Sequence, residues 1–194
     1  MFFYRAYRWL LLLPFLLLSG CGASLDDYRG QGPNWDLARF FNGKLVAHGL
    51  VTDRSGEVTS RFRVEMQGRW REGKGELFEQ FYFDDGERQQ RIWTIRASDD
   101  GYRGTAADIK GEAQGSVGGF AMNWQYAMEL QVGDSQYSVI FDDWLYQLDE
   151  VHLLNRAAIR KFGLQVGEVT LLFIRGQSQC PASWQASAAA HAVR

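Results

Sequence analysis

The sequence contains few of the residues that build metal sites and disulfide frameworks. Its 194 residues include two cysteines, Cys21 and Cys180, and three histidines that lie far apart, His48, His152 and His191. Scattered histidines without paired cysteines exclude the common zinc-site spacings. No phosphate-binding glycine loop, dinucleotide fingerprint or nucleophile elbow is present either. We therefore expect no metal and no cofactor, and no catalytic residue can be assigned.

A strong charge of one sign is also missing. The chain carries 21 basic and 23 acidic residues, which gives a formal net charge of −2. No basic run or basic stripe interrupts this balance. Proteins that bind nucleic acid usually show such a basic surface, so we expect no nucleic-acid partner.

Long apolar runs are missing as well, apart from residues 9–18 near the start of the chain. This run is shorter than the roughly 20 residues that a membrane-spanning helix needs, and Pro14 interrupts it. Arg5 and Arg8 precede the run, and Leu-Ser-Gly-Cys follows at residues 18–21. A basic start, a short apolar core and small residues before a cysteine are typical of a bacterial lipoprotein signal peptide. Residues 1–20 are therefore predicted to be removed.

The cysteine at this junction would then become the lipid-modified first residue. Acyl chains on Cys21 would anchor the protein to a membrane, since burial of their methylenes is favourable. Two alternatives remain, an ordinary secretory signal with a chance cysteine and a short membrane anchor. Gly22 follows in place of an aspartate, which resembles the sorting pattern for the outer membrane, facing the periplasm, more than that for the inner membrane. With Cys21 acylated, Cys180 has no internal disulfide partner and is expected to be a surface thiol.

The rest of the chain divides by composition into three parts. Residues 21–34 are small, polar and rich in glycine, which is typical of a flexible tether. Residues 35–176 form the expected folded domain, and residues 177–194 an expected poorly ordered tail. Within the domain, residues 34–43 predict one short helix with Asn34 or Asp36 as its cap.

Most of the domain shows the pattern of β-strands. Between residues 61 and 70, Phe62, Val64, Met66 and Trp70 share one parity, while charged and polar residues occupy the other. This period of two indicates strands with one apolar face. Glycine-containing turn signals recur at short spacing, which predicts an all-β, antiparallel up-and-down β-barrel of about 8–10 strands, lipocalin-like. An integral outer-membrane barrel is excluded, because such barrels need an apolar outer band and this outer parity carries three arginines. Residues 152–161 could be helix or strand.

One predicted hairpin brings opposite charges onto an apolar face. If residues 84–86 form a three-residue loop, Glu79 lies opposite Arg91. Each then shares its face with aromatic side chains, among them Phe81 and Trp93. A buried carboxylate or guanidinium must be paired, so this is either a structural ion pair or a pair that orients a ligand.

Two further polar segments could contribute to a functional site. Asp142 and Asp143 resemble a paired-carboxylate site, but neighbouring strand residues point to opposite faces, so a strand bend or turn explains them as well. Asn155, Arg156 and Lys161 could line the mouth of the barrel, although solvent exposure explains the two cations equally.

Five ordered blocks of this sequence resemble one known family. They are FFNGKLVAHGLVTDRSGEVTSRF, FDDGERQQRIW, GTAADIKGEAQG, FDDWLYQLDE and LLNRAAIRKFG, which follow the lipoprotein-like start. Together they are similar to the domain-of-unknown-function family 3833 of Gram-negative lipoproteins. The resemblance implies a lipoprotein address and a lipocalin-like fold. It implies no catalytic residue.

Three functions fit these features. The first is a binding module whose barrel holds a fatty acid or other apolar ligand. The second is an envelope enzyme that acts on lipid or cell-envelope material, and the third is a structural partner of another envelope protein, whose identity the sequence does not indicate. For the binding module, the candidate ligand contacts are Glu79, Phe81, Arg91, Trp93, Asp142 and Asn155.

Overall fold

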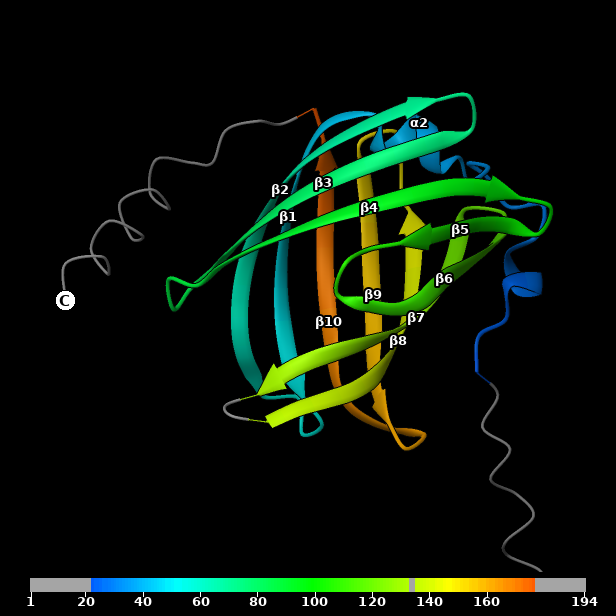
Figure 1. The fold of residues 1–194 in the computed structure, drawn as a ribbon. Helices are drawn as coiled ribbons and strands as arrows, with labels where there is room; N and C mark the ends of the chain where they lie inside the picture. The colour runs from blue at the N-terminus through cyan, green and yellow to red at the C-terminus, as the bar shows by residue number, and fades with distance from the viewer. Residues whose placement is uncertain (1–21, 133–134, 177–194) are drawn as a thin grey trace, which may run out of the picture.

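The domain is one closed antiparallel sheet. The structure, a computed structural model, describes residues 22–132 and 135–176. Ten strands follow one another around the barrel, and β1 pairs with β10 to close it (Figure 1). The all-β, up-and-down barrel predicted from the sequence is confirmed. Its strands are β1 (Gly43–Asp53), β2 (Val58–Arg71), β3 (Lys74–Phe83), β4 (Arg88–Ser98), β5 (Gly101–Thr105), β6 (Ile109–Gly118), β7 (Ala121–Val132), β8 (Ser135–Gln147), β9 (His152–Lys161) and β10 (Leu164–Arg175).

The ambiguous segment 152–161 is a strand. Along β9, Leu153, Asn155 and Ala157 are buried, whereas Arg156 between them is exposed. This alternation has the period of a strand and buries every second side chain inside the barrel. The strand pairs with β8 on one side and β10 on the other, so its backbone groups are satisfied without a helix.

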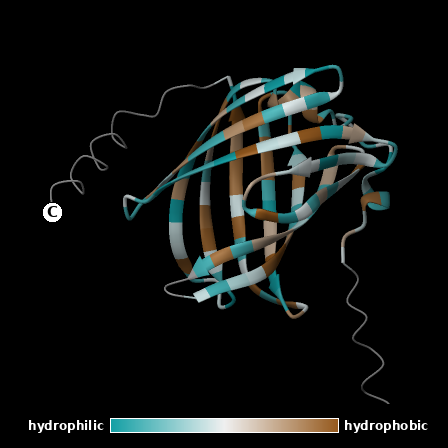
Figure 2. Cartoon of the chain, viewed as in Figure 1, coloured by the Kyte–Doolittle hydropathy of each residue, from teal (hydrophilic) through white to brown (hydrophobic). Residues whose placement is uncertain are grey.

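Alternation of apolar and polar residues gives the barrel its inside and outside. On β2, Phe62, Val64 and Met66 are at most 5% exposed. Arg61 and Arg69, on the other parity, are exposed. Brown and teal alternate along the long strands in Figure 2 for the same reason. A shift of one residue would turn this set outward, so the apolar pattern fixes the register.

A short helix seals one end of the barrel. Helix α2 (Leu37–Phe41) begins at Asp36, whose side chain caps it, as one of the two expected caps. Its apolar side chains point into the barrel, and Phe41 packs on Phe173 of β10 with ring centroids 5.5 Å apart. The end of α2 lies so close to Gly68 that a Cβ there would be 1.8 Å from the carbonyl oxygen of Phe41. This end is therefore closely packed.

The segment before α2 lies partly against the outer wall. Within the expected tether, residues 25–28 form the 3-10 helix η2 (Leu25–Tyr28), which starts with a capping box at Ser24. The ring of Tyr28 packs on Phe120 and Tyr146, with centroids 5.2 and 5.9 Å apart. An aromatic residue and a capped turn thus hold part of a segment that composition alone predicts to be flexible. No helix among the described residues is long and apolar enough to cross a bilayer.

The strand register places the turns at two opposite ends. Gly43 pairs with Gly68 beside α2, whereas Asp53 pairs with Gly167 at the far end. The turn between β2 and β3 therefore lies at the α2 end, and the turn between β9 and β10 lies at the other. Figure 1 shows α2 at the top and the β9–β10 turn at the bottom of the barrel.

Candidate functional site

The barrel encloses a cavity of about 340 Å³. Its wall is mainly apolar, and α2 closes it through Leu37 and Phe41. Toward the end away from α2, three aromatic rings from β2 and β3 form one surface. Their centroids lie 5.3–6.2 Å apart, and the rings belong to Phe62, Phe81 and Phe83. The volume lies within the range of roughly 300–1,000 Å³ typical of small-molecule pockets.

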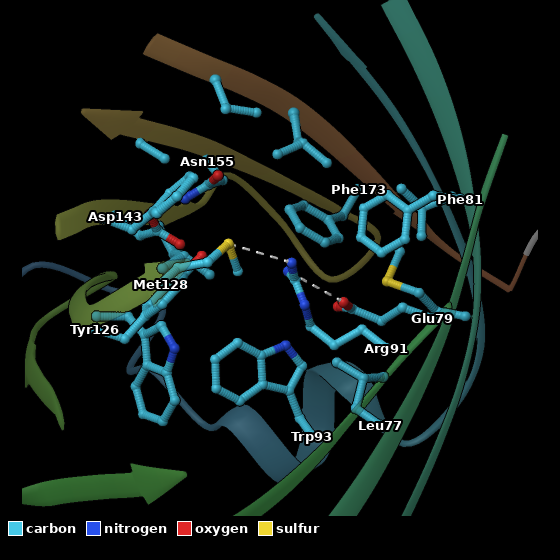
Figure 3. Close-up of a pocket in the computed structure, with 18 of the residues that line it drawn as sticks. Leu77, Glu79, Phe81, Arg91, Trp93, Tyr126, Met128, Asp143, Asn155 and Phe173 are labelled. Atoms are coloured by element: carbon cyan, nitrogen blue, oxygen red, sulfur yellow. Dashed lines mark hydrogen bonds and ion pairs between the residues drawn. The ribbon is translucent and has the colours of Figure 1, made fainter. Parts of the chain in front are cut away.

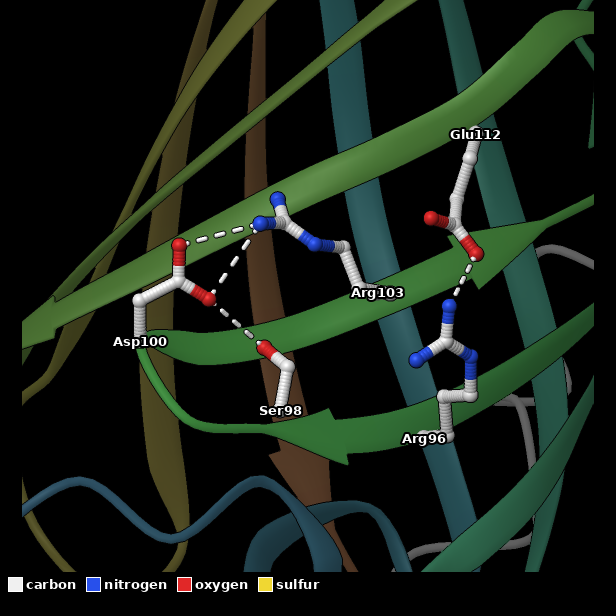
Figure 4. Close-up of polar contacts among 5 residues, drawn as sticks. All are labelled: Arg96, Ser98, Asp100, Arg103 and Glu112. Carbon is white, nitrogen blue, oxygen red and sulfur yellow. Dashed lines mark hydrogen bonds and ion pairs between the residues drawn. The ribbon is translucent and has the colours of Figure 1, made fainter.

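The charged hairpin pair lies inside this cavity, in the register that the sequence predicts. The amide of Phe83 donates to the carbonyl oxygen of Glu87 over 3.0 Å, and Gly86 in this loop has a φ of 93°. Glu79 of β3 is therefore opposite Arg91 of β4. The side chains of both line the cavity, and Glu79 Oε2 lies 3.9 Å from Arg91 Nη1 (Figure 3).

The guanidinium of Arg91 is bound more closely by a residue that sequence reasoning missed. Arg91 Nε and Nη2 lie 2.8 and 2.7 Å from Oδ2 of Asp108, in the turn between β5 and β6. Nη2 also lies 3.7 Å from the sulfur of Met128, and the guanidinium carbon lies 5.4 Å from the ring centroid of Phe81. The Nε–Nη2 edge of the guanidinium, which could otherwise bind a ligand carboxylate, is therefore already occupied by Asp108.

The carboxyl group of Glu79 is favoured in its protonated form. Glu79 is 8% exposed, and burial raises its pKa to about 7, although the positive charge of Arg91 opposes this shift. Trp93, opposite Leu77, also lines the cavity and hydrogen-bonds Glu79. Near neutral pH this acid therefore exchanges between a charged and a neutral form.

A second carboxyl group enters the cavity from the opposite wall. Asp143 of β8 shares its inward parity with Phe141 and Leu145. Its Oδ1 is buried and has no hydrogen-bond partner. Burial raises the pKa of Asp143 to about 8 against the opposing charge of Arg91, and Asp142 adds to the rise. This carboxyl group can accept a hydrogen bond or, when protonated, donate one.

The ring of Tyr126 completes this wall. Tyr126 of β7 lies parallel to Phe141, with centroids 5.1 Å apart, and its hydroxyl hydrogen-bonds Asp143. Burial raises the pKa of Tyr126 well above its usual value. The hydroxyl therefore stays neutral and positions the carboxyl group. The alternation of Met122, Trp124, Tyr126 and Met128 in the sequence could have revealed this inward face.

Asp142, which was predicted to contact a ligand, lies outside the cavity. Its Oδ1 accepts hydrogen bonds from Asn123 and Gln125 over 2.8 and 3.0 Å, and its Oδ2 lies 3.4 Å from Arg160. Successive strand residues point to opposite faces, so Asp143 occupies the inner position instead. The two aspartates therefore do not form a joint acid and base.

The predicted mouth residues also separate by parity. Asn155 is 3% exposed and lines the cavity, with Nδ2 donating to the carbonyl oxygen of Trp144 over 3.4 Å. Arg156 points outward and pairs with Glu168. Lys161 has the same parity as Asn155, and its Nζ lies over the Tyr137 ring, 3.7 Å from the ring centroid.

The structure thus brings five of the six predicted ligand contacts together. They are Glu79, Phe81, Arg91, Trp93 and Asn155. Cys21, the predicted lipidation site, lies outside the described residues, as does Cys180. Over residues 22–132 and 135–176, no group of histidine, cysteine or acidic side chains could hold a metal ion.

Fold and site together define a class of protein, a small closed antiparallel barrel with an apolar internal cavity, which is compatible with a binding module. The chain belongs to the family described as protein of unknown function (DUF3833), whose model matches residues 15–175. The resemblance identified from the sequence is confirmed. A comparison with curated proteins finds no match.

Proposed function

We propose that the barrel binds one single-chain lipid, such as a fatty acid or a related molecule, in its internal cavity. The observation that carries this proposal is the cavity itself, about 340 Å³ and walled mainly by aromatic and aliphatic side chains. A packed structural barrel would fill this space with side chains. An apolar tail would lie against Phe62, Phe81 and Phe83, where its burial removes it from water.

The polar groups of the cavity restrict the head of such a lipid. Arg91 is paired with Asp108, so a ligand carboxylate would have to displace an existing partner. Glu79 and Asp143 would also repel an anion once they lose their protons, above about pH 7 and pH 8. The proposed head group is therefore uncharged in the bound state, either an alcohol or a protonated acid, and hydrogen-bonds Asp143.

Calorimetry with a chain-length series tests this proposal on residues 22–194. Affinity should rise about four-fold with each added methylene, and the heat capacity of binding should be negative. Ala157→Phe should abolish binding because Ala157 lines the cavity. Its neighbour Ala158 lies on the outer parity, so Ala158→Phe is the matched control. Affinity that does not depend on chain length, or equal losses in both variants, would contradict an internal lipid site.

The head group is tested by comparing an acid with its alcohol at two pH values. The acid should bind more weakly at pH 9 than at pH 6, since the cavity gains negative charge between them. The alcohol should change much less. An acid that binds equally well at both values would leave the cavity in place and would restore Arg91 as its anion receptor.

The proposed setting is the outer membrane, where acyl chains on Cys21 hold the barrel on the periplasmic side. Support comes from the apolar run at residues 9–18 and the Leu-Ser-Gly-Cys junction after it. Cys21→Ser should leave an unprocessed precursor without acyl chains. A Cys21→Ser protein that reaches its normal size and still fractionates with the outer membrane would refute the anchor.

The enzyme remains a second candidate for one specific reason. Asp143 and Tyr126 are hydrogen-bonded inside the cavity, and the pKa of Asp143 is raised to about 8. Perturbed acids of this kind occur at catalytic sites as well as in binding pockets. Recovery of a bound lipid chemically unchanged after prolonged incubation would favour the binding module.

A further inference from the structure

The turn between β9 and β10 combines features that are unfavourable in water. It consists of Phe162 and Gly163, with φ values of 51° and 80°, between the paired residues Lys161 and Leu164. Two positive φ values define a tight hairpin turn in which asparagine, aspartate or glycine is usual at the first position. A bulky residue in this conformation is an outlier. The phenylalanine ring is 95% exposed.

The turn on the opposite end of the barrel provides a comparison. Glu72 and Gly73 connect β2 to β3 with φ values of 50° and 75°, so the backbone is nearly the same. There the first position is a charged residue, which water solvates. Since the same turn forms with glutamate, the backbone does not require the aromatic side chain of Phe162. Within the barrel the ring has Lys161 beside it, with Nζ 5.5 Å from the ring centroid.

Phe162 belongs to a larger apolar patch on β8, β9 and β10, which we call the tip patch. Its members are 95%, 72%, 41% and 37% exposed, in the order Phe162, Leu164, Val166 and Tyr137. Leu164 pairs with Lys161, whose ammonium group lies over the ring of Tyr137, so Leu164 and Tyr137 share one face of the sheet next to the turn. Isolated exposed apolar residues are ordinary, but a contiguous group marks an interaction surface.

The charges around the tip patch indicate its partner. Between residues 160 and 166 the charged side chains are Arg160 and Lys161. Arg160 is paired with Asp142 on the outer face, whereas Lys161 lies over the ring of Tyr137 and carries its ammonium group to the edge of the patch. An exposed aromatic tip with a cation beside it matches the interface of an anionic bilayer, where rings enter the acyl boundary and cations remain at the phosphates.

We propose that the tip patch inserts into the surface of an anionic lipid bilayer, with Phe162 deepest. The patch lies at the end of the barrel that α2 does not close. Inserting it would bring the unplugged end of the barrel to the bilayer, so that a lipid could pass between the two without crossing water. This contact is separate from both the ligand of the cavity and the anchor at Cys21.

The test places a polarity-sensitive fluorophore on one of two matched positions. Leu164 and Lys74 each follow the glycine of one of the two turns. Each is replaced in turn by cysteine in residues 22–194 carrying Cys180→Ser, so that the label has a single thiol, and the labelled protein is bound to vesicles of phosphatidylcholine and phosphatidylglycerol. The label at 164 should report an apolar environment and be shielded several-fold from an aqueous quencher. The label at 74 should remain in water.

Two further variants make the result specific. In the protein labelled at 164, Phe162→Glu copies the residue of the opposite turn and should return the label to water. Lys161→Glu should weaken shielding on anionic vesicles but have little effect on purely zwitterionic ones. Equal quenching at positions 164 and 74 in wild type would overturn the proposal. So would shielding that persists in Phe162→Glu, which would instead indicate a protein partner or self-association. Neither result depends on whether the cavity binds a lipid.

Discussion

At the α2 end of the barrel, the apolar side chains of the helix point inward and are sealed from water, whereas at the opposite end the ring at the β9–β10 turn points outward into it. Phe40 of α2 is 2% exposed, and Phe162 of the β9–β10 turn is 95% exposed. Both ends also contain a two-residue turn with nearly the same backbone. Because the local geometry is shared, the backbone of the turn does not determine whether glutamate or phenylalanine occupies its first position.

The largest expected effect on stability comes from removing one aromatic ring at each end of the barrel. Phe40→Ala leaves a cavity beneath α2 and should lower the free energy of unfolding by about 3–5 kcal/mol. Phe162→Ala removes a ring that touches little and should change it by less than about 0.5 kcal/mol. Urea denaturation measures both. Similar losses would show that the ring of Phe162 packs on the barrel in solution.

An effect of intermediate size on the free energy of unfolding is expected for Asp143, which lies in the cavity between the two ends of the barrel. Its folded-state pKa is raised to about 8, above the unfolded value, so the contribution to stability is present below about pH 4. It is lost as the pH rises from about 4 toward 8, because in this range the unfolded aspartate is ionised while the buried carboxyl group still holds its proton. Asp143→Asn should therefore be more stable than wild type at pH 9, by about 1–3 kcal/mol.

Thermal melting from pH 4 to pH 9 provides the measurement for this variant. The two proteins should melt at similar temperatures at pH 4 and diverge as the pH rises. Asp142→Asn is the matched control, because Asp142 lies on the outer parity and hydrogen-bonds Asn123 and Gln125. Parallel melting curves for Asp143→Asn and wild type would mean that water or a counter-charge reaches Asp143.

The smallest expected effect on stability comes from replacing the first residue of each two-residue turn. Asparagine adopts a positive φ more readily than either native residue, so Phe162→Asn and Glu72→Asn should each stabilise the protein by less than about 1 kcal/mol. The gains should be equal within error in the absence of lipid. A loss of stability in Phe162→Asn alone, measured by the same denaturation, would show that the exposed ring stabilises its hairpin.

The sequence predicted those parts of the site that depend on parity and turn length. A three-residue loop ending in Gly86 was enough to place Glu79 opposite Arg91. The same argument could have distinguished Asp143 from Asp142, because Phe141 and Leu145 mark the inward parity of β8. Without that step, Asp142 was predicted as a ligand contact, whereas Asp143 is the aspartate that lines the cavity. Periodicity therefore predicts which side chains point inward.

The contact between Arg91 and Asp108 was beyond such reasoning. Asp108 reaches Arg91 because β5 is short and the following turn brings the carboxylate back toward the cavity. The contact between Tyr126 and Asp143 is more local, because β7 and β8 are consecutive strands in which Trp124 pairs with Asp143 and Tyr126 is the next residue of the same parity.

The seam between β1 and β10 has a consequence for how the protein is made. Leu45 pairs with Arg175, and Asp53 pairs with Gly167, so the seam joins the two ends of the domain. Pairings this distant in sequence give a high contact order, and chains of high contact order fold slowly. Until β10 is available, β1 and β9 are both open edges that can pair with other chains. The protein therefore depends on protection from aggregation for as long as its last strand is missing.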